Sequence, residues 1–143
     1  MKNKFFIFLI LFFFNYFICL NANSIEQFNF DVTEIEILEK GNLIKGLKKG
    51  KITTDKNVII SANTFVYKKN INILEANGNV EIIDNENNIK IFANNVKYFK
   101  NNERIITNGN SKAINNKGLI ISAENFDYQK IENILIVRSN VII

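Results

Sequence analysis

The sequence contains no histidine and no proline, and its only cysteine is Cys19. Histidine is the commonest general base and metal ligand in proteins, so its absence excludes the most frequent catalytic and metal-binding arrangements. Beyond Cys19 the chain can form no disulfide and offers no thiolate nucleophile. Asn, Ile and Lys are abundant, and we assign this bias, together with the missing proline, to genomic base composition.

Residues 1–22 are expected to be a signal peptide. Lys2 and Lys4 precede an apolar run of 16 residues, Phe5 to Leu20, which is followed by small or polar residues up to Ser24. A membrane-spanning helix needs roughly 20 residues, so cleavage near Ala22 and export are favoured over a retained inner-membrane helix. Ile18 is too large for a lipoprotein signal before Cys19.

The remaining residues, about 120, have the size of one domain. Removing the leader leaves 16 basic and 14 acidic residues, a net charge of +2. A balance this small predicts no general affinity for nucleic acid. No pattern in the sequence points to a cofactor.

An internal repeat determines the expected architecture. Three segments superpose without gaps: VIISANTFVY from Val58, IKIFANNVKY from Ile89 and LIISAENFDY from Leu119. In each, an alanine is followed five positions on by a tyrosine, giving the pairs Ala62 and Tyr67, Ala93 and Tyr98, and Ala123 and Tyr128. A degenerate first copy places Phe28, Phe30, Val32, Ile35 and Ile37 at the same offsets.

The second half of each repeat alternates apolar and polar residues with period two, which indicates strands with one buried face. In the first half the alternation slips by one residue after the alanine, so a bulge or corner is expected at Asn63-Thr64, Asn94-Asn95 and Glu124-Asn125. Turns are expected at 68–72, 84–88, 99–103, 115–118 and 129–133. Asn77-Gly78 and Asn108-Gly109 resemble hairpin turns, but the alternation keeps its phase through both glycines, which favours closely approached points within strands.

Four repeats of two strands predict an all-β protein with about eight antiparallel strands in a twisted, partly rolled sheet. No helical period follows Ser24. We expect no helix longer than two turns.

An enzyme has little support in this sequence, and no catalytic residue is assigned. The acid–base candidates are Glu34, Glu36, Asp84, Glu86, Asp127 and Glu132, and no spacing forces two of them into one cleft. They are interpreted as solvated residues of turns and outer faces. The Asp84 and Glu86 segment could hold Ca²⁺ loosely, but it lacks the spaced ligands of a calcium loop, so no metal site is predicted.

The densest charge lies at Lys40, Lys45, Lys48, Lys49 and Lys51. These ammonium groups could meet the phosphates of a lipid head group, although a solvated turn face explains them equally simply. The aromatic residues Phe65, Tyr67, Tyr98, Phe126 and Tyr128 fall on the apolar face and are expected in the core.

The segments 61–82 and 121–143 resemble the repeat of the OstA-like N-terminal domain family, in which an alanine, a polar residue and a tyrosine precede a loop and an apolar strand ending in Gly-x-Val. The resemblance covers residues 28–143. The family includes the periplasmic lipopolysaccharide-transport protein of LptA type, its inner-membrane-anchored relative and the N-terminal domain of the LPS-assembly protein LptD.

The resemblance implies an antiparallel β-jellyroll, open at both ends, that shields acyl chains of lipopolysaccharide in an apolar interior in the periplasm, without catalysis or cofactor. The implied lipid-facing positions are Ile60, Phe65, Leu74, Val80, Ile91, Val96, Ile105, Ile121, Phe126 and Leu135. It also implies end-to-end strand pairing with other OstA-like domains, from a second copy or from inner- and outer-membrane transport partners. The expected interface residues are Phe28, Phe30, Val32, Val137, Val141 and Ile143, because neither edge carries proline and each carries few charges.

Two alternatives stay open. A structural β-repeat scaffold of the cell envelope would share the strands but would pack its interior dry, and a carboxylate hydrolase would need a polar cleft. The last copy ends at Ile143 in mid-pattern, which fits a free bridge protein, an anchored relative or part of a longer outer-membrane assembly protein.

Overall fold

The computed structural model describes residues 28–143, and the predicted leader lies outside them. Within this range the chain forms thirteen strands in one sheet: β1 (Phe28–Val32), β2 (Ile35–Leu38), β3 (Leu43–Gly46), β4 (Gly50–Thr54), β5 (Val58–Ala62), β6 (Thr64–Lys68), β7 (Ile73–Asp84), β8 (Ile89–Phe99), β9 (Arg104–Asn108), β10 (Ser111–Asn115), β11 (Ile120–Ala123), β12 (Asn125–Gln129) and β13 (Ile134–Arg138). The helical elements of the described residues are three single 3-10 turns, η1 (Glu39–Gly41), η2 (Lys69–Ile71) and η3 (Lys100–Asn102). The expectation of an all-β fold is confirmed.

The thirteen strands belong to eight antiparallel legs, the number expected from the repeat. The legs are β1 with β2, β3 with β4, β5 with β6, β7, β8, β9 with β10, β11 with β12, and β13 with its continuation to Ile142. Each leg pairs with the next along the chain, so the sheet is an up-and-down meander. Five of the seven connections between legs are the turns that the sequence predicted; the turns at 39–42 and 55–57 were not predicted.

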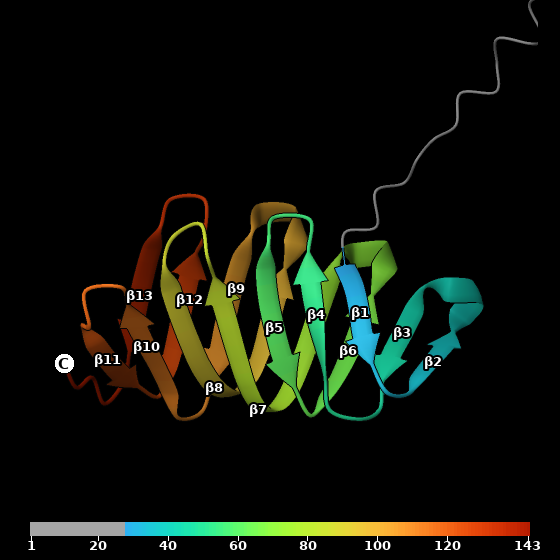
Figure 1. Cartoon of the computed structure of the whole chain (residues 1–143), viewed down its shortest axis with the longest axis horizontal. Coiled ribbons are helices and arrows are strands. Elements are labelled where there is room, and N and C mark those ends of the chain that lie inside the picture. Colours follow the sequence, from blue (N-terminus) through green and yellow to red (C-terminus); the bar gives the residue numbers. More distant parts are fainter. Residues whose placement is uncertain (1–27) are drawn as a thin grey trace, which may run out of the picture.

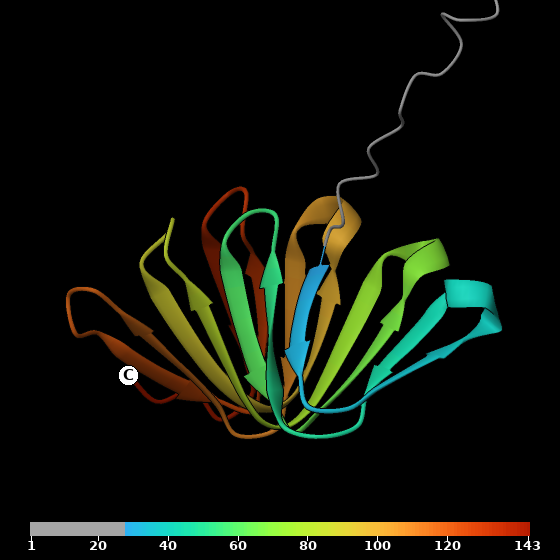
Figure 2. The ribbon, with the colours of Figure 1, turned by 45° about the vertical axis from the view of Figure 1, so that its right-hand side comes forward.

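The legs bend at one corner and form two layers. Layer A contains β1, β4, β5, residues 80–84 of β7, residues 89–93 of β8, β10 and β11. Layer B contains β2, β3, β6, residues 73–77 of β7, residues 95–99 of β8, β9, β12 and β13. Figure 2 shows the two layers meeting along the corner and diverging toward the turns at the opposite side.

The corner lies at the predicted positions. Ala62 ends β5 and Ala123 ends β11, while β7 and β8 run through the corner with a register shift between Asn77 and Val80. A repeated hydrogen bond ties neighbouring legs here: the N–H after each repeat alanine donates to the carbonyl of Gly78, Gly109 or Ser139, at 2.9–3.0 Å. The corner is therefore built by the repeat itself.

The two glycines mark a close approach rather than hairpin turns. Gly78 and Gly109 have φ of +78° and +80°, a conformation that L side chains rarely adopt. A Cβ at Gly78 would lie 2.7 Å from Nδ2 of Asn63, and one at Gly109 would lie 2.9 Å from Nδ2 of Asn94. Gly78 lies within β7, as the sequence predicted, whereas Gly109 lies in the break between β9 and β10.

One row of inward side chains crosses all eight legs of layer B in strand register: Ile37, Ile44, Tyr67, Leu74, Tyr98, Ile105, Tyr128 and Leu135. The middle of this row is fully buried, and the apolar side chains of layer A cover it. Among the described residues, no helix is long and apolar enough to cross a membrane.

Candidate functional site

The space between the layers is the candidate binding region, because the ten predicted lipid-facing residues point into it. Eight of them are less than 5% exposed: Ile60, Phe65, Leu74, Val80, Ile91, Val96, Ile105 and Phe126. Ile121 and Leu135 are only partly buried and pack at the margin of the core. The central interior is thus filled by the protein's own side chains, as in an ordinary core.

Aromatic side chains seal this interior near the N-terminal end. Phe28 is 4% exposed, and its ring lies 4.7 Å from the ring of Tyr67 and 5.9 Å from that of Tyr98 in edge-on geometry. The side chain of Phe28, predicted at an interface, therefore belongs to the core of its own chain. Only its backbone, on the outer strand β1, faces a free edge.

The interior opens at the C-terminal end. A cavity of about 310 Å³ lies between the layers there, with Ala113, Leu119 and Ile121 on layer A and Tyr128 and Leu135 on layer B. Asparagine side chains, among them Asn115 and Asn133, line its outer rim. Apolar side chains and asparagines line this cavity in similar measure, which suits an amphipathic ligand.

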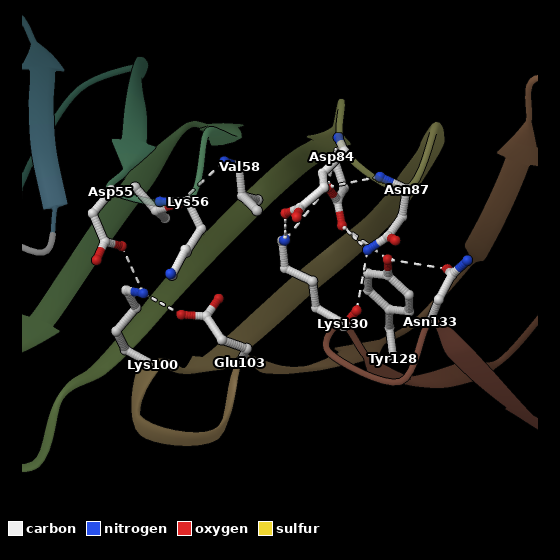
Figure 3. Close-up of polar contacts among 12 residues, drawn as sticks. Asp55, Lys56, Val58, Asp84, Asn87, Lys100, Glu103, Tyr128, Lys130 and Asn133 are labelled. Carbon is white, nitrogen blue, oxygen red and sulfur yellow. Dashed lines mark hydrogen bonds and ion pairs between the residues drawn. The ribbon is translucent and has the colours of Figure 1, made fainter.

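Polar clasps join the two layers across the side opposite the corner (Figure 3). In the first clasp, Lys100 on the layer B turn lies 2.7 Å from Asp55 on the layer A turn and also contacts Glu103. Glu103 in turn accepts a hydrogen bond from the hydroxyl of Tyr98. Burial lowers the pKa of Lys100, but the hydrogen bonds to Asp55 and Glu103 outweigh it and raise the pKa overall.

The second clasp repeats the arrangement one repeat further along. Lys130 lies between Asp84, at 3.8 Å, and Glu86, and the hydroxyl of Tyr128 donates to Asp84 at 2.8 Å. Asn87 donates to the carbonyl oxygen of Lys130 at 3.1 Å. Burial and the hydrogen bond to Asp84 raise the pKa of Tyr128, so its hydroxyl stays protonated and the clasp stays intact at neutral pH.

Two of the six carboxylates that were interpreted as solvated, Asp84 and Asp127, are buried, whereas Glu34, Glu36, Glu86 and Glu132 keep substantial exposure. Asp84 is 1% exposed, and Asp127 is 5% exposed because Arg104 binds it through two hydrogen bonds of 2.8 and 2.7 Å. The alternation pattern gives no reason to bury a residue in a turn, so the carboxylates in turns were predicted to face solvent. The signal that could have found the clasps is the recurrence of Lys69, Lys100 and Lys130 two positions after the repeat tyrosines.

The predicted basic stretch lies on the outer face beside acidic neighbours. Lys45, Lys48 and Lys51 form ion pairs of 3.3, 2.9 and 3.7 Å with Glu36, Glu34 and Asp31 of the neighbouring leg. These cross-strand pairs balance most of the positive charge. They favour the solvated-face interpretation over a phosphate site.

Two residues depart from the second half of the repeat: Ser111 occupies the position of Val80 and Val141, and Lys48 occupies that of Gly78 and Gly109. Ser111 is 2% exposed, and its hydroxyl contacts that of Thr107 and donates to the carbonyl of Glu124, so a buried polar pair replaces apolar contact. Lys48 lies outside the strands, in the break between β3 and β4. Among residues 28–143, no three His, Cys, Asp or Glu side chains are placed to hold a metal ion.

The remaining predicted interface residues lie along the two ends of the sheet. Phe30, Val32 and Val137 are partly buried against the core, whereas Val141 and Ile143 are exposed. Within the described chain, β1 and β2 are the outer strands at one end, and β13 with the segment to Ile142 forms the other. Both ends thus present free strand edges.

No protein-family model matches the sequence, and no curated protein sequence matches it either. A solved structure does match: LptH from Pseudomonas aeruginosa, described as the LptA-homologous periplasmic component of the conserved lipopolysaccharide transport device. The superposition has a TM-score of 0.71 and covers 81% of this chain and 94% of LptH, at 14% sequence identity. The chain has the fold of LptH.

The LptH fold confirms the architecture that the repeat and the resemblance predicted. At 14% identity the comparison shows a shared backbone arrangement alone. The corner and the meander are accordingly properties of the fold. The residues of the clasps and of the C-terminal cavity have to be argued for this chain alone.

Proposed function

We propose that the protein binds lipopolysaccharide in the periplasm and passes it toward the outer membrane, with acyl chains held between layers A and B and the sugar head group left in water. The observation that carries the proposal is the two-layer apolar interior, open at its C-terminal end, on the fold of a periplasmic lipopolysaccharide-transport component. Each buried CH₂ group is worth about 0.8 kcal/mol, so long acyl chains need such shielding in water.

The cavity beyond the Lys130 clasp is the point at which a chain would enter. Ile121 and Leu135 line it and are the two predicted lipid-facing residues that are not fully buried. Further penetration would require side chains of the central core to move apart. The closed clasps oppose such a separation of the layers, because they link turns of both.

We also propose that such modules join end to end by strand pairing, with further copies or with transport partners of the same fold at the inner and outer membranes. The free edges at both ends of the sheet support this. A binding role without catalysis is supported by the buried charges, since Asp84, Lys100, Glu103 and Lys130 contact one another or their neighbours within the clasps. Export by a cleaved signal peptide completes the proposal.

Photo-crosslinking tests the lipid site. A photo-reactive residue at Ile121, in the cavity, should crosslink to lipopolysaccharide, whereas the same residue at Lys112 should not, because Lys112 is exposed on the adjacent strand β10. Equal labelling at both positions, or labelling at Lys112 alone, would place the lipid on the outer face and reject the proposed interior site.

A structural envelope scaffold is the second candidate. The dry central interior favours it, because eight predicted lipid-facing positions contact protein side chains instead of open space. A scaffold would assemble through its edges without lipid and show no crosslink from Ile121. The same experiment therefore separates the two functions.

A further inference from the structure

The two clasps differ in what each lysine would leave behind if it moved away. In the first clasp the side chain of Glu103 is 10% exposed, and its partners within residues 28–143 are Lys100 and the hydroxyl of Tyr98. Without Lys100, this buried carboxylate would keep one hydrogen-bond donor. Leaving a buried charge without its partner is strongly destabilising, so the Lys100 clasp is a fixed contact between the layers.

The carboxylate of Asp84 in the second clasp is satisfied without its lysine. It accepts hydrogen bonds from the backbone N–H groups of Glu86 and Asn87, at 3.1 and 3.3 Å. The side-chain amide of Asn87 donates to it at 2.9 Å, and the hydroxyl of Tyr128 donates at 2.8 Å. Lys130 adds a contact of 3.8 Å. A carboxylate has about four acceptor sites, so the four donors occupy them and Lys130 can leave without stranding the charge.

The other carboxylate of this clasp already faces water. The side chain of Glu86 is 67% exposed, although it contacts Lys130. If the lysine leaves, water replaces it around Glu86 at little cost. The side chain of Lys130 is 6% exposed, and a buried ammonium group is unfavourable without an anion. The second clasp can therefore open, provided that another anion takes the place of its carboxylates on Lys130.

The releasable clasp borders the candidate lipid cavity. Asn87, Tyr128 and Asn133 line that cavity of about 310 Å³, and Asn87 also donates to the carbonyl oxygen of Lys130. Figure 3 shows Lys130 extending from its turn toward Asp84, beside Tyr128 and Asn87. A ligand in the cavity lies within reach of the lysine.

Building on the proposed binding of lipid between the layers, we infer that Lys130 is the phosphate-binding residue of the lipid site. A phosphate group of the bound lipid takes the place of Asp84 and Glu86 on its ammonium group. With acyl chains in the interior and sugars in water, the phosphates of such a lipid lie where the two regions meet. The clasps lie on that side of the molecule, opposite the corner. A phosphate carries more negative charge than one carboxylate and offers strong acceptor oxygens, so it competes well for a lysine.

The charge of the clasp requires exchange instead of simple addition. One ammonium group and two carboxylates give Lys130, Asp84 and Glu86 a net charge of −1, which repels a phosphate while both carboxylates stay in contact. The exposed side chain of Glu86 can turn into water and give up its place. Three lysines of the predicted basic stretch are less suited to the phosphate, because cross-strand carboxylates hold them on the outer face.

Lipid selectivity tests the role of Lys130. The probes are lipid A, the acylated and phosphorylated part of lipopolysaccharide, and the same lipid A with its phosphates removed. A photo-reactive residue at Ile121 of the full-length chain should label the phosphorylated form about fivefold more strongly. Lys130→Met should bring this ratio to about one while the labelling of the dephosphorylated form persists, and Lys130→Arg should keep the ratio, because a guanidinium also binds phosphate. Lys97→Met, on the outer face, is the matched control and should leave the ratio unchanged.

Exchange predicts the opposite effect at the carboxylate. Glu86→Gln should raise the ratio about threefold, because the phosphate then displaces a neutral amide instead of a competing charge. Glu132→Gln, at an exposed position, should have no effect. A ratio that Lys130→Met leaves intact, or that Glu86→Gln lowers, would overturn the inference. Excess inorganic phosphate should not change the ratio, and its loss under that condition would assign Lys130 to free phosphate and overturn the lipid assignment.

Thermal unfolding tests the difference between the clasps. Lys130→Met should lower the unfolding temperature less than Lys100→Met does, because only the second variant strands a buried carboxylate. An equal or larger loss for Lys130→Met would show a fixed clasp and overturn the exchange. Equal labelling of both lipids from Ile121 would uphold lipid binding and reject the role of Lys130 alone. Labelling of neither lipid would reject the interior site, and the proposed function with it.

Discussion

At the scale of single residues, the small side chains at the corner are the most constrained feature. Ala62, Ala93 and Ala123 are 1–8% exposed and lie where each leg passes from layer A to layer B. The alanine recurs at the same offset in three of the four repeats, with Val32 in the first copy, and the two layers meet here (Figure 2). A larger side chain at these buried positions would press against its neighbours in the core.

Ala93→Leu should therefore destabilise the protein by roughly 1–3 kcal/mol through overpacking. Lys90→Leu is the matched control, because Lys90 lies on the same strand with an exposed side chain and should tolerate the change. Urea unfolding followed by circular dichroism measures both. An unfolding midpoint for Ala93→Leu equal to that of the unmodified chain would contradict the corner packing.

A carboxylate–guanidinium pair on layer B predicts the acid response. The hydrogen bonds from Arg104 lower the pKa of Asp127 below its ordinary value of 3.8, although burial opposes them. Because the unfolded carboxyl takes up a proton more readily than the folded one, the stabilisation is present above about pH 4 and is lost as the pH falls through the lowered pKa. Hydrogen bonds from Lys68 and Lys97 lower the pKa of Glu75 in the same way, against the effect of burial.

The free energy of unfolding should thus fall between pH 5 and pH 2, and Asp127→Asn should make that fall shallower while reducing stability at neutral pH. Glu132→Gln, at an exposed position, serves as the control and should leave the pH dependence unchanged. Urea titrations at several pH values give the slopes. An unaltered slope for Asp127→Asn would show that the pair contributes nothing to acid unfolding.

At the scale of elements, the clasps determine whether the layers stay together on the side opposite the corner. The side chains of Lys100 and Glu103 are 5% and 10% exposed, so removing one of them leaves the other charge buried without its partner. Lys100→Met should cost roughly 3 kcal/mol. Lys97→Met should cost less than about 1 kcal/mol, because Lys97 is 48% exposed and Glu75 keeps its other partner, Lys68.

Adding Glu103→Gln to Lys100→Met should recover much of the loss, since the unpaired buried charge is removed while the amide oxygen can still accept the hydrogen bond from Tyr98. Thermal unfolding of the three variants measures this. Equal costs for Lys100→Met and Lys97→Met would mean that the clasp is no stronger than a surface ion pair.

The elements also show how far sequence reasoning reaches. Period-two alternation and the slip after each alanine predicted the legs and the corner, because these depend on which face each side chain must take. Clusters of turn-forming residues predicted five of the turns, but the turns at 39–42 and 55–57 were missed, where the first copy of the repeat is degenerate. The clasps were missed because they join turns that are distant in the chain, such as Asp55 with Lys100 and Glu86 with Lys130, and alternation carries no information on which turns face each other. The same limitation applies to the cavity at Ile121 and Leu135, which depends on the spacing of the layers.

At the scale of the whole molecule, the edge at the C-terminal end of layer A offers a direct test of assembly. Ile142 and Ser122 exchange both backbone hydrogen bonds, at 2.8 and 2.9 Å. Since backbone groups alternate in direction along a strand, the N–H groups of Val141 and Ile143 point away from β11 toward the free edge. These are the donors that a docking strand would use.

Val141→Pro should weaken self-association, or binding to a domain of the same fold, roughly fivefold or more, because proline removes one edge donor and leaves the exchange with Ser122 in place. Asn140, with φ of +52°, precedes Val141, and a following proline disfavours helical backbone at that residue. Ile143→Pro is therefore the second variant, because the residue before it is the bridged Ile142.

Val141→Ala keeps the donor and should associate nearly as the unmodified chain does. Sedimentation across a concentration series measures all three. If both proline variants associate as the unmodified chain does, this edge takes no part in assembly. If the unmodified chain stays monomeric, both alone and beside domains of the same fold, the protein acts as an isolated carrier.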